Sequence, residues 1–334
     1  QVVDRTQQYR VHLVFFDDGD RLAFALEVDK HRQLLLQDGG RMGQHRIGLT
    51  NGGPLDPQAF EYCNRLLQNP EGATALEISF GGLQLEATVD TYICLTGANM
   101  NLRINNIEQA RWEVLAIKAG DNIAVEFAEQ GCRAYLGVAG GFQVEPTFGS
   151  TATVMREKVG GLNGDKLQAG DVLPCAQVTE CKHLYLPASS QPRYQNLITV
   201  RVIPGYQQQH FNRYEQRRFF SHTYTVSDRC DRMGYRLEGP AIDCDIQGIL
   251  SEGICFGAIQ IPADGQPIVL LNDRQTIGGY PKIGSALSLD CGRLAQLRPG
   301  GPVHFAPVSP HGAHNALHLA ASFSRRQPLM ERTA

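Results

Sequence analysis

Residues 268–282 read IVLLNDRQTIGGYPK. The apolar run 268–271 predicts a buried strand. The residues that follow bring an acid, a guanidinium, an amide, a hydroxyl, a phenol and an ammonium group close together. Gly278 and Gly279 permit backbone conformations that other residues resist and let a ligand or another chain approach closely. Pro281 removes a backbone donor and stiffens the exit. A polar hairpin would explain such a stretch, but so many hydrogen-bonding groups favour one wall of a ligand site.

The rest of the chain alternates short apolar runs with frequent glycine and proline. These runs cover residues 84–87, 92–96, 113–117, 122–127 and 134–139. Many short strands separated by turns are typical of barrels and sandwiches, so we predict a mainly β fold with a few short helices. The best helix candidate spans Pro57 to Leu67, with proline near its start and Phe60, Cys63 and Leu67 along one face.

A length of 334 residues favours two domains, because single cores usually stop growing below this size. Residues 186–196 carry the best linker composition. We therefore predict an N-terminal extension of unclear origin, two domains, and a C-terminal helix with a tail. These four segments span residues 1–33, 34–190, 197–308 and 309–334.

Composition excludes several classes of protein. Hydrophobic residues make up 42% and charged residues 19% of the chain, which is typical of a globular protein. A net charge of −3 without runs of like charge argues against nucleic-acid and membrane partners. No apolar run approaches the roughly 20 residues of a spanning helix, and residues 1–10 lack the apolar middle of a signal peptide. We therefore expect a cytoplasmic protein.

The nine cysteines include no C-x-x-C pair, and several lie in apolar runs. Buried thiols in a reducing compartment are the best interpretation, and the spacing argues against a zinc cluster. His311, His314 and His318 form a second candidate, because the last two would share a helix face as a metal pair. No carboxylate supports them, so an exposed helix face is favoured and no metal is expected.

Two further polar stretches are candidate sites. The first contains Gln37 and Asp38, follows an apolar strand and runs on to His45; its glycines could turn backbone N–H groups toward an anion or carbonyl. The second, residues 228–237, contains Arg232 and Tyr235 among alternating acids and arginines. It fits a solvated salt-bridge loop as well as a carboxylate-binding site, for which arginine has a suitable planar fork. A glycine-rich structural loop remains an alternative for the first.

The common catalytic signatures are missing from the sequence. There is no G-x-x-x-x-G-K-[ST], G-x-S-x-G, H-E-x-x-H or G-x-G-x-x-G motif. Residues 160–166, GGLNGDK, come nearest to a phosphate-binding loop, but their spacing differs. The sequence therefore does not show where a nucleotide would bind.

Taken together, these stretches carry a family resemblance. The chain is similar to the family variously called allophanate hydrolase subunit 2, KipA-like, or carboxyltransferase domain A/B. The similarity runs in order from about Leu34 to Phe305, and the last motif is distinctive. The motifs that carry it are residues 36–43, 53–56, 75–82, 95–98, 134–141, 232–239 and 273–282.

The resemblance implies a two-part, β-rich protein with a cyclophilin-like β-barrel in its second half. Free-standing bacterial members resemble the C subunit of ATP-dependent 5-oxoprolinase, which opens 5-oxoproline (pyroglutamate) to L-glutamate together with separate A and B subunits. The implied partners are thus the A subunit and a C/D-type, KipI-like B subunit. ATP is the implied cofactor, and its site could lie in one of these partners. No Met-Lys biotin attachment site is present in this chain.

Two other activities remain open. One is a KipA-like regulatory protein that sequesters a KipI-like partner, and the other is a carboxyltransferase module acting on a urea-like amide. For the oxoprolinase activity, Arg274 or Arg232 would bind the substrate carboxylate, and Asp273 is a candidate general base. Ile277 stands where a second threonine is usual. The candidate catalytic residues are Asp273, Arg274, Gln275, Thr276, Tyr280 and Lys282, and the candidate substrate-binding residues are Arg232, Tyr235, Gln37, Asp38, His45, Gly278 and Gly279.

Overall fold

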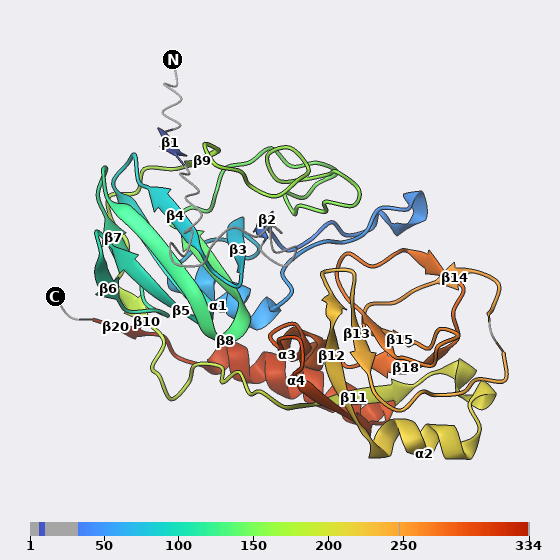
Figure 1. The fold of residues 1–334 in the computed structure, drawn as a ribbon. Helices are drawn as coiled ribbons and strands as arrows, with labels where there is room; N and C mark the ends of the chain where they lie inside the picture. Colours follow the sequence, from blue (N-terminus) through green and yellow to red (C-terminus); the bar gives the residue numbers. More distant parts are fainter. Residues whose placement is uncertain (1–6, 11–32, 247, 333–334) are drawn as a thin grey trace, which may run out of the picture. The chain divides into compact units, whose positions relative to one another are not determined.

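The computed structural model describes residues 7–10, 33–246 and 248–332, which divide into two compact units (Figure 1). The first unit draws on Gln1–Arg41, Gly52–Pro192 and Pro328–Ala334, as far as these are described. The second unit draws on Met42–Asn51 and Arg193–Gln327. The second unit is therefore largely an insertion between two parts of the first.

Strands β1 to β9 form one sheet in the first unit. Its path runs β2-β3-β8-β4-β1-β9, and β5 pairs with β6, β7 and β8. The long strands β5 and β8 pair antiparallel with three register shifts, which bend the sheet. The strands are β1 (Gln7–Arg10), β2 (Leu34–Gln37), β3 (Ala75–Ser79), β4 (Leu83–Glu86), β5 (Thr91–Ile104), β6 (Ile107–Gln109), β7 (Leu115–Ile117), β8 (Asn122–Val138) and β9 (Val172–Cys175).

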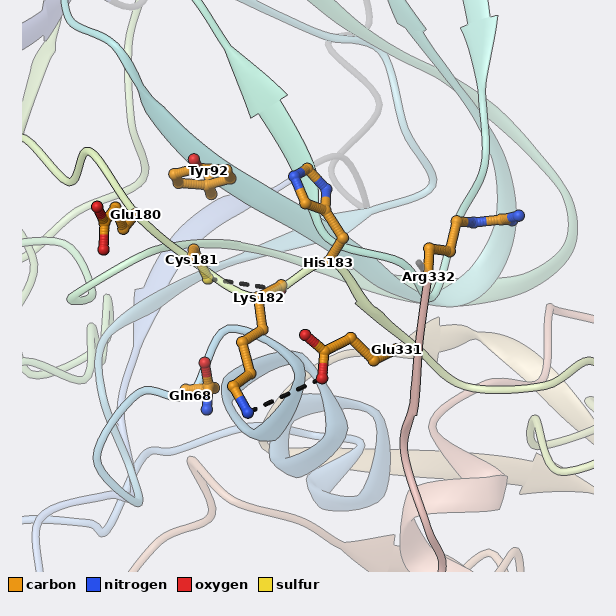
Figure 2. Close-up of a pocket in the computed structure, with 8 residues that line it drawn as sticks. All are labelled: Gln68, Tyr92, Glu180, Cys181, Lys182, His183, Glu331 and Arg332. Carbon is orange, nitrogen blue, oxygen red and sulfur yellow. Dashed lines mark hydrogen bonds and ion pairs between the residues drawn. The ribbon is translucent and has the colours of Figure 1, made fainter. Parts of the chain in front are cut away.

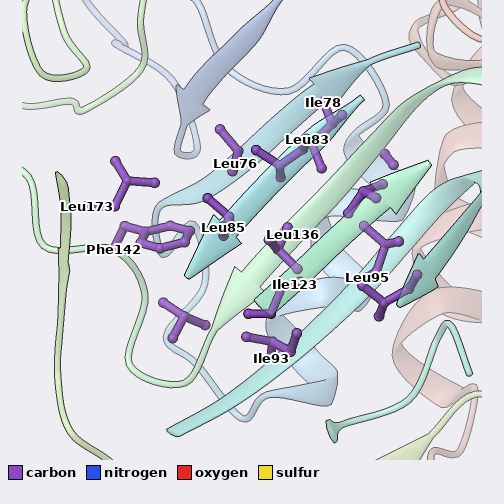
Figure 3. Packing of buried hydrophobic residues seen from close by; sticks show 14 of the residues in the cluster. Leu76, Ile78, Leu83, Leu85, Ile93, Leu95, Ile123, Leu136, Phe142 and Leu173 are labelled. Atoms are coloured by element: carbon purple, nitrogen blue, oxygen red, sulfur yellow. The ribbon is translucent and has the colours of Figure 1, made fainter. Parts of the chain in front are cut away.

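Buried apolar clusters lie on both faces of this sheet, the larger on one face and a second, which includes α1, on the other. Alternation along β4 buries Leu83 and Leu85 while the residues between them stay half-buried. Figure 3 shows how side chains from several strands of the sheet and from Phe142 pack together into one apolar cluster. This confirms the predicted mainly β fold, but β5 and β8 are long strands, and the runs 122–127 and 134–139, expected as separate strands, belong to β8. The members of the cluster labelled in Figure 3 are Leu76, Ile78, Leu83, Leu85, Ile93, Leu95, Ile123, Leu136, Phe142 and Leu173.

Helix α1 (Pro57–Leu66) covers another part of the sheet, as the sequence predicted to within one residue. Asp56 caps it, because its carboxylate accepts a hydrogen bond from the Ala59 amide at 3.1 Å. Gly137 of β8 lets the helix approach closely: a Cβ atom there would lie 2.7 Å from the Cys63 sulfur. The helix is therefore fixed by a capping residue at its start and a glycine beneath it.

A two-stranded pair also belongs to the first unit. Strand β10 (Leu184–Tyr185) pairs antiparallel with β20 (Met330–Glu331), whose residues lie far away in the chain. The Arg332 guanidinium binds both carboxylate oxygens of Glu113, one at 2.8 Å, and lies 5.1 Å from the Tyr185 ring. These contacts attach the end of the described chain to the first unit.

The second unit contains a closed barrel, which confirms the expected architecture of the second half. Its strands follow the order β11-β18-β15-β16-β13-β12-β19, with β11 and β19 parallel and the other pairs antiparallel. They are β11 (Ile198–Pro204), β12 (Thr223–Cys230), β13 (Gly234–Glu238), β15 (Ala258–Gln260), β16 (Ile268–Leu270), β18 (Lys282–Ala286) and β19 (Pro302–Pro307).

Short elements surround the barrel strands. Strands β14 (Glu252–Gly253) and β17 (Ile277–Gly278) pair with each other outside the barrel ladder. The sequence predicted only the last helix of this half, and it is longer than the short helix expected. The helical segments of this unit are η1 (His45–Ile47), η2 (Tyr206–His210), α2 (Arg213–Ser221), α3 (Ser288–Leu294) and α4 (Pro310–Arg326).

Close backbone packing helps to close the barrel. Gly284 of β18 lies opposite Pro204 of β11, and a Cβ atom on Gly284 would lie 2.6 Å from the Ile203 carbonyl oxygen. Next to β19, the rings of Phe219 and Phe305 stack with centroids 4.3 Å apart. Helix α2 is thereby held against the barrel by an aromatic contact.

The remaining expectations have mixed outcomes. The N-terminal extension predicted over residues 1–33 lies largely outside the described residues, whereas Gln7–Arg10 form β1 and pair with β9. All nine cysteines are present as thiols; six are buried, and Cys255 is exposed. In the described part of the chain, no helix combines the length and the apolar character needed to cross a membrane.

Candidate functional site

The predicted loop after β16 folds against two other segments of the second unit. Its start is held by the Met233 carbonyl, which accepts from the Leu271 amide at 2.9 Å, and by the Arg232 carbonyl, which accepts from the Asp273 amide at 2.9 Å. Its end pairs with β14, where Ile254 donates to the Thr276 carbonyl at 3.0 Å. The structure thus brings together two stretches that are separate candidates in the sequence.

Arg232 and Asp273 form a buried ion pair. Arg232 donates from Nε to Oδ2 at 2.9 Å and from Nη2 to Oδ1 at 3.0 Å. The two residues are 3% and 5% exposed. A bidentate pair at this depth balances both charges and fixes both side chains. In this arrangement Asp273 is the counter-ion of Arg232.

Arg274 is also buried, but its surroundings differ. Its Nε donates to the Ile254 carbonyl at 3.2 Å and its Nη1 to the Leu271 carbonyl at 3.3 Å. The Phe256 ring lies 5.9 Å from its Cζ. Within the described residues no carboxylate pairs with Arg274, and burial lowers the pKa of its guanidinium. Among the described residues, this buried cation is therefore surrounded by backbone carbonyls and an aromatic ring rather than by an acid.

Lys282 belongs to a third polar group. Its ammonium pairs with the Glu252 carboxylate, and its backbone amide donates to the Gln207 side chain at 2.8 Å. The Gln207 amide donates to Glu252 at 3.0 Å. Hydrogen bonds from Lys282 and then Tyr206 lower the pKa of Glu252, and the same carboxylate raises the pKa of the Tyr206 phenol. This network ties η2, β14 and β18 together.

The other predicted residues of this loop lie near its surface. Gln275 is exposed, Thr276 is half-buried, and Tyr280 is 47% exposed. Gly279 accepts from the Ile249 amide at 2.8 Å. A Cβ atom on Gly278 would lie 2.9 Å from the Gln260 amide nitrogen and would also meet Ile254, so this glycine permits close packing.

Tyr235 lies apart from these exposed groups. It is 1% exposed, and its hydroxyl donates to the Ala295 carbonyl at 3.0 Å. The side chain is therefore buried and ties β13 to the end of α3.

Gln37 and Asp38 lie in the first unit, where they fasten a distant loop. Gln37 donates to the Thr153 carbonyl at 3.1 Å and accepts from Gly53 at 3.0 Å. Asp38 accepts from the Ser150 hydroxyl at 2.6 Å and from the Thr151 amide at 2.7 Å. These contacts match the structural-loop alternative for this stretch. His45 lies in the second unit, exposed, in η1.

The histidines of α4 form a pair rather than a cluster. The Nε2 atoms of His314 and His318 lie 2.9 Å apart, and both side chains are exposed. Among the residues that the structure describes, no three His, Cys, Asp or Glu side chains are grouped to hold a metal ion. The pair forms part of an exposed helix face.

A groove of about 680 Å³ in the first unit is a second candidate (Figure 2). Its charged groups are mostly matched: Lys182 lies 3.8 Å from Glu331, and Arg332 binds Glu113. Surface pairs of this kind are weak and exchange readily with solvent. The groove is lined by Gln68, Tyr92, Glu180, Cys181, Lys182, His183, Glu331 and Arg332.

Several residues around the loop were not predicted from the sequence. Glu252, Gln207 and Tyr206 were not selected, and neither was Cys255, whose thiol lies 3.3 Å from the Ser285 hydroxyl. No local pattern marks them, because they meet the loop only through contacts between segments far apart in the sequence. The usable signal was Glu252 itself, a charged residue within the largely apolar stretch 248–256.

Known proteins resemble this chain in sequence. A family model described as "Carboxyltransferase domain, subdomain A and B" matches residues 47–307. The C subunit of the Escherichia coli 5-oxoprolinase is 37% identical over 276 residues, covering 82% of this chain and 88% of that protein. The C subunit of the Haemophilus influenzae 5-oxoprolinase is 34% identical over 283 residues, covering 84% and 90%.

A solved structure extends the likeness to the fold. The urea carboxylase of Kluyveromyces lactis superposes with a TM-score of 0.85 and 24% identity, covering 96% of this chain and 29% of that one. At this identity the likeness supports the shared fold alone. The chain spans less than a third of that larger protein.

Proposed function

This chain belongs to the family of carboxyltransferase domains, subdomains A and B, and from that premise we propose that it is one component of an ATP-dependent 5-oxoprolinase. The complex would open 5-oxoproline to L-glutamate together with the A and B subunits as partners. The observation that carries this proposal is the similarity to two bacterial 5-oxoprolinase C subunits over nearly their whole length. The larger urea-processing relatives share only a part of their length with this chain.

The chemistry demands activation of a poor electrophile. Phosphorylation of the lactam oxygen by ATP would give ADP and a carbon that water can attack. The ring C–N bond then breaks to give an acyl phosphate and the free amine, and a second water hydrolyses the acyl phosphate to L-glutamate and phosphate. A protein catalyses such a series of steps by holding the substrate rigidly and by placing hydrogen-bond donors where negative charge develops. We assign ATP binding to one of the partners, because this chain lacks the common phosphate-loop spacing.

The loop around β17 offers suitable donors for the lactam. Gln275 and Tyr280 have exposed side chains that a small substrate can reach, and Thr276 is half-buried beside them. We propose that Gln275 and Thr276 bind the amide group. Lys282, fixed by Glu252, would contribute positive potential near the developing oxyanion. Asp273, as the counter-ion of Arg232, would hold the loop in place.

A second function is favoured by one observation. Large side chains are exposed around the same loop: Leu250 is 94%, Tyr206 70% and Ile277 60% exposed. Tyrosine and aliphatic side chains exposed together are typical of interfaces. They fit docking of a C/D-type, KipI-like partner, either as part of the enzyme or as sequestration without chemistry.

The experiment that separates these functions is glutamate release from 5-oxoproline and ATP, with this chain added to the purified A and B subunits. The oxoprolinase proposal expects release that needs this chain and that falls roughly tenfold or more in Gln275→Ala. Glu238→Gln, an exposed change on β13, serves as the matched control. Complex formation without glutamate release would contradict the enzyme proposal and support sequestration.

A further inference from the structure

Among the described residues, the buried charges next to the candidate loop are paired except for that of Arg274. Asp273 pairs with Arg232, and Glu252 pairs with Lys282. In the adjoining helix α3, Asp290 pairs with Arg201 at 2.8 Å. Arg274 remains as a cation without an acid among the described residues, although it is 5% exposed. Burying an unpaired charge is costly, so such an arrangement indicates that a counter-ion is supplied from outside.

The hydrogen bonds of Arg274 show which part of it is available. A guanidinium carries five N–H donors. The Ile254 carbonyl takes the donor on Nε and the Leu271 carbonyl takes one on Nη1. Among the described residues nothing accepts from Nη2. The remaining donors therefore form the Nη1–Nη2 edge, which suits two parallel bonds to one carboxylate.

The segment over Arg274 supplies further polar groups. Ile254 and Phe256, which both contact the guanidinium, flank Cys255 on either side. The exposed Cys255 thiol lies 3.3 Å from the hydroxyl of Ser285. A thiol and a hydroxyl beside a buried guanidinium can both donate to an anion.

We propose that Arg274, with Cys255 and Ser285 beside it, forms the subsite that receives the carboxylate of the substrate. This deepens and rests on the proposed function, since it names the substrate class as a small lactam that bears a carboxylate. One unmatched positive charge fits a monoanionic carboxylate better than a phosphate of higher charge. Arg232 does not bind the substrate carboxylate in this proposal, because its Nε and Nη2 atoms already donate to Asp273.

The subsite is tested by measuring the binding of small carboxylates without ATP, both to this chain alone and to its complex with the A and B subunits. Calorimetry would compare 5-oxoproline, L-proline, acetate, 2-pyrrolidinone and inorganic phosphate. We expect 5-oxoproline to bind and 2-pyrrolidinone, which lacks the carboxylate, to bind at least about tenfold more weakly. Arg274→Gln should weaken 5-oxoproline binding by a similar factor. Arg236→Gln, which removes an arginine that Asp264 already pairs on the surface, should leave it unchanged.

A labelling experiment keeps the test independent of how the variant folds. Cys255 is exposed, whereas the other cysteines are buried or half-buried. The subsite predicts that 5-oxoproline slows alkylation of Cys255 in the unaltered protein several-fold, read by peptide mass spectrometry, and that 2-pyrrolidinone does not.

The outcomes separate the two proposals. Binding and protection by acetate and proline as strong as by 5-oxoproline would support the subsite and contradict 5-oxoproline as the substrate. Tighter binding of phosphate than of every carboxylate would overturn the carboxylate assignment. Unchanged 5-oxoproline affinity in folded Arg274→Gln, or no carboxylate binding in either the isolated chain or the complex, would overturn the subsite.

Discussion

Arg232 and Asp273 lie 41 positions apart in the sequence and meet through two hydrogen bonds of 2.9 and 3.0 Å inside the second unit. Strand β13 begins two residues after Arg232, and β16 ends three residues before Asp273. Their antiparallel pairing sets Gly234 opposite Leu270. The register of two barrel strands therefore positions the ion pair.

Loss of one partner should destabilise the protein. Asp273→Asn leaves the Arg232 guanidinium buried without its carboxylate, and we expect a loss of about 3–5 kcal/mol in the free energy of unfolding. Urea denaturation measures it. The double variant Arg232→Met/Asp273→Leu should recover most of that loss, and equal loss in both proteins would contradict the ion-pair explanation.

Acid should weaken the contact between Glu252 and Lys282. The pKa of Glu252 is lowered in the folded protein, first by Lys282 and then by Tyr206. The stabilisation is therefore present above the ordinary glutamate pKa and is lost as pH falls through the lowered value. Thermal unfolding of Glu252→Gln should differ most from the unaltered protein near neutral pH, and the gap should close in acid. Glu238→Gln should track the unaltered protein throughout.

Two glycine-to-alanine substitutions in the second unit should show whether close backbone packing at Gly284 stabilises the barrel. Gly284→Ala would place a Cβ atom 2.6 Å from the Ile203 carbonyl oxygen. We expect a loss of about 1–3 kcal/mol, because the backbone of β11 has to move. Gly253→Ala has no heavy atom within 4 Å of the added carbon and should change stability by less than about 0.5 kcal/mol. Equal effects would contradict the close-approach explanation.

A buried tyrosine should prove important in the first unit. The Tyr135 hydroxyl donates to Glu77 at 2.7 Å and accepts from the Asp56 amide at 2.8 Å. Burial and the nearby Glu77 raise the pKa of this phenol well above its usual value, so it stays protonated. Tyr135→Phe should cost about 1–3 kcal/mol in chemical denaturation. Tyr92→Phe, whose hydroxyl makes one exposed contact with the Thr179 carbonyl, is the control and should cost far less.

Local sequence signals account for much of the fold. Alternating runs predicted β strands such as Leu83–Glu86, and proline with an acidic capping residue marks the start of α1. The barrel was expected from family resemblance rather than from periodicity. Helices α2 and α3 were missed, because nine and seven residues carry too little periodicity to stand out.

The candidate site was predictable only in part. The polar loop after β16 was found because its composition departs from that of a core. Its neighbours were not, since Glu252 and Gln207 reach Lys282 from segments far away in the sequence, which no local pattern encodes. The difference between Arg232 and Arg274 was also hidden, because a counter-ion is a property of the tertiary structure.

The pairing of β10 with β20 has a consequence for synthesis of the protein. Tyr185 leaves the ribosome long before its partner Met330, and nearly the whole second unit is made between them. The β10–β20 pair of the first unit therefore cannot form until Met330 has been synthesised, whereas the second unit can close its barrel before that. Docking of β20 then becomes a late step of folding, and a nascent chain stalled before Met330 would present β10 with one unpaired edge.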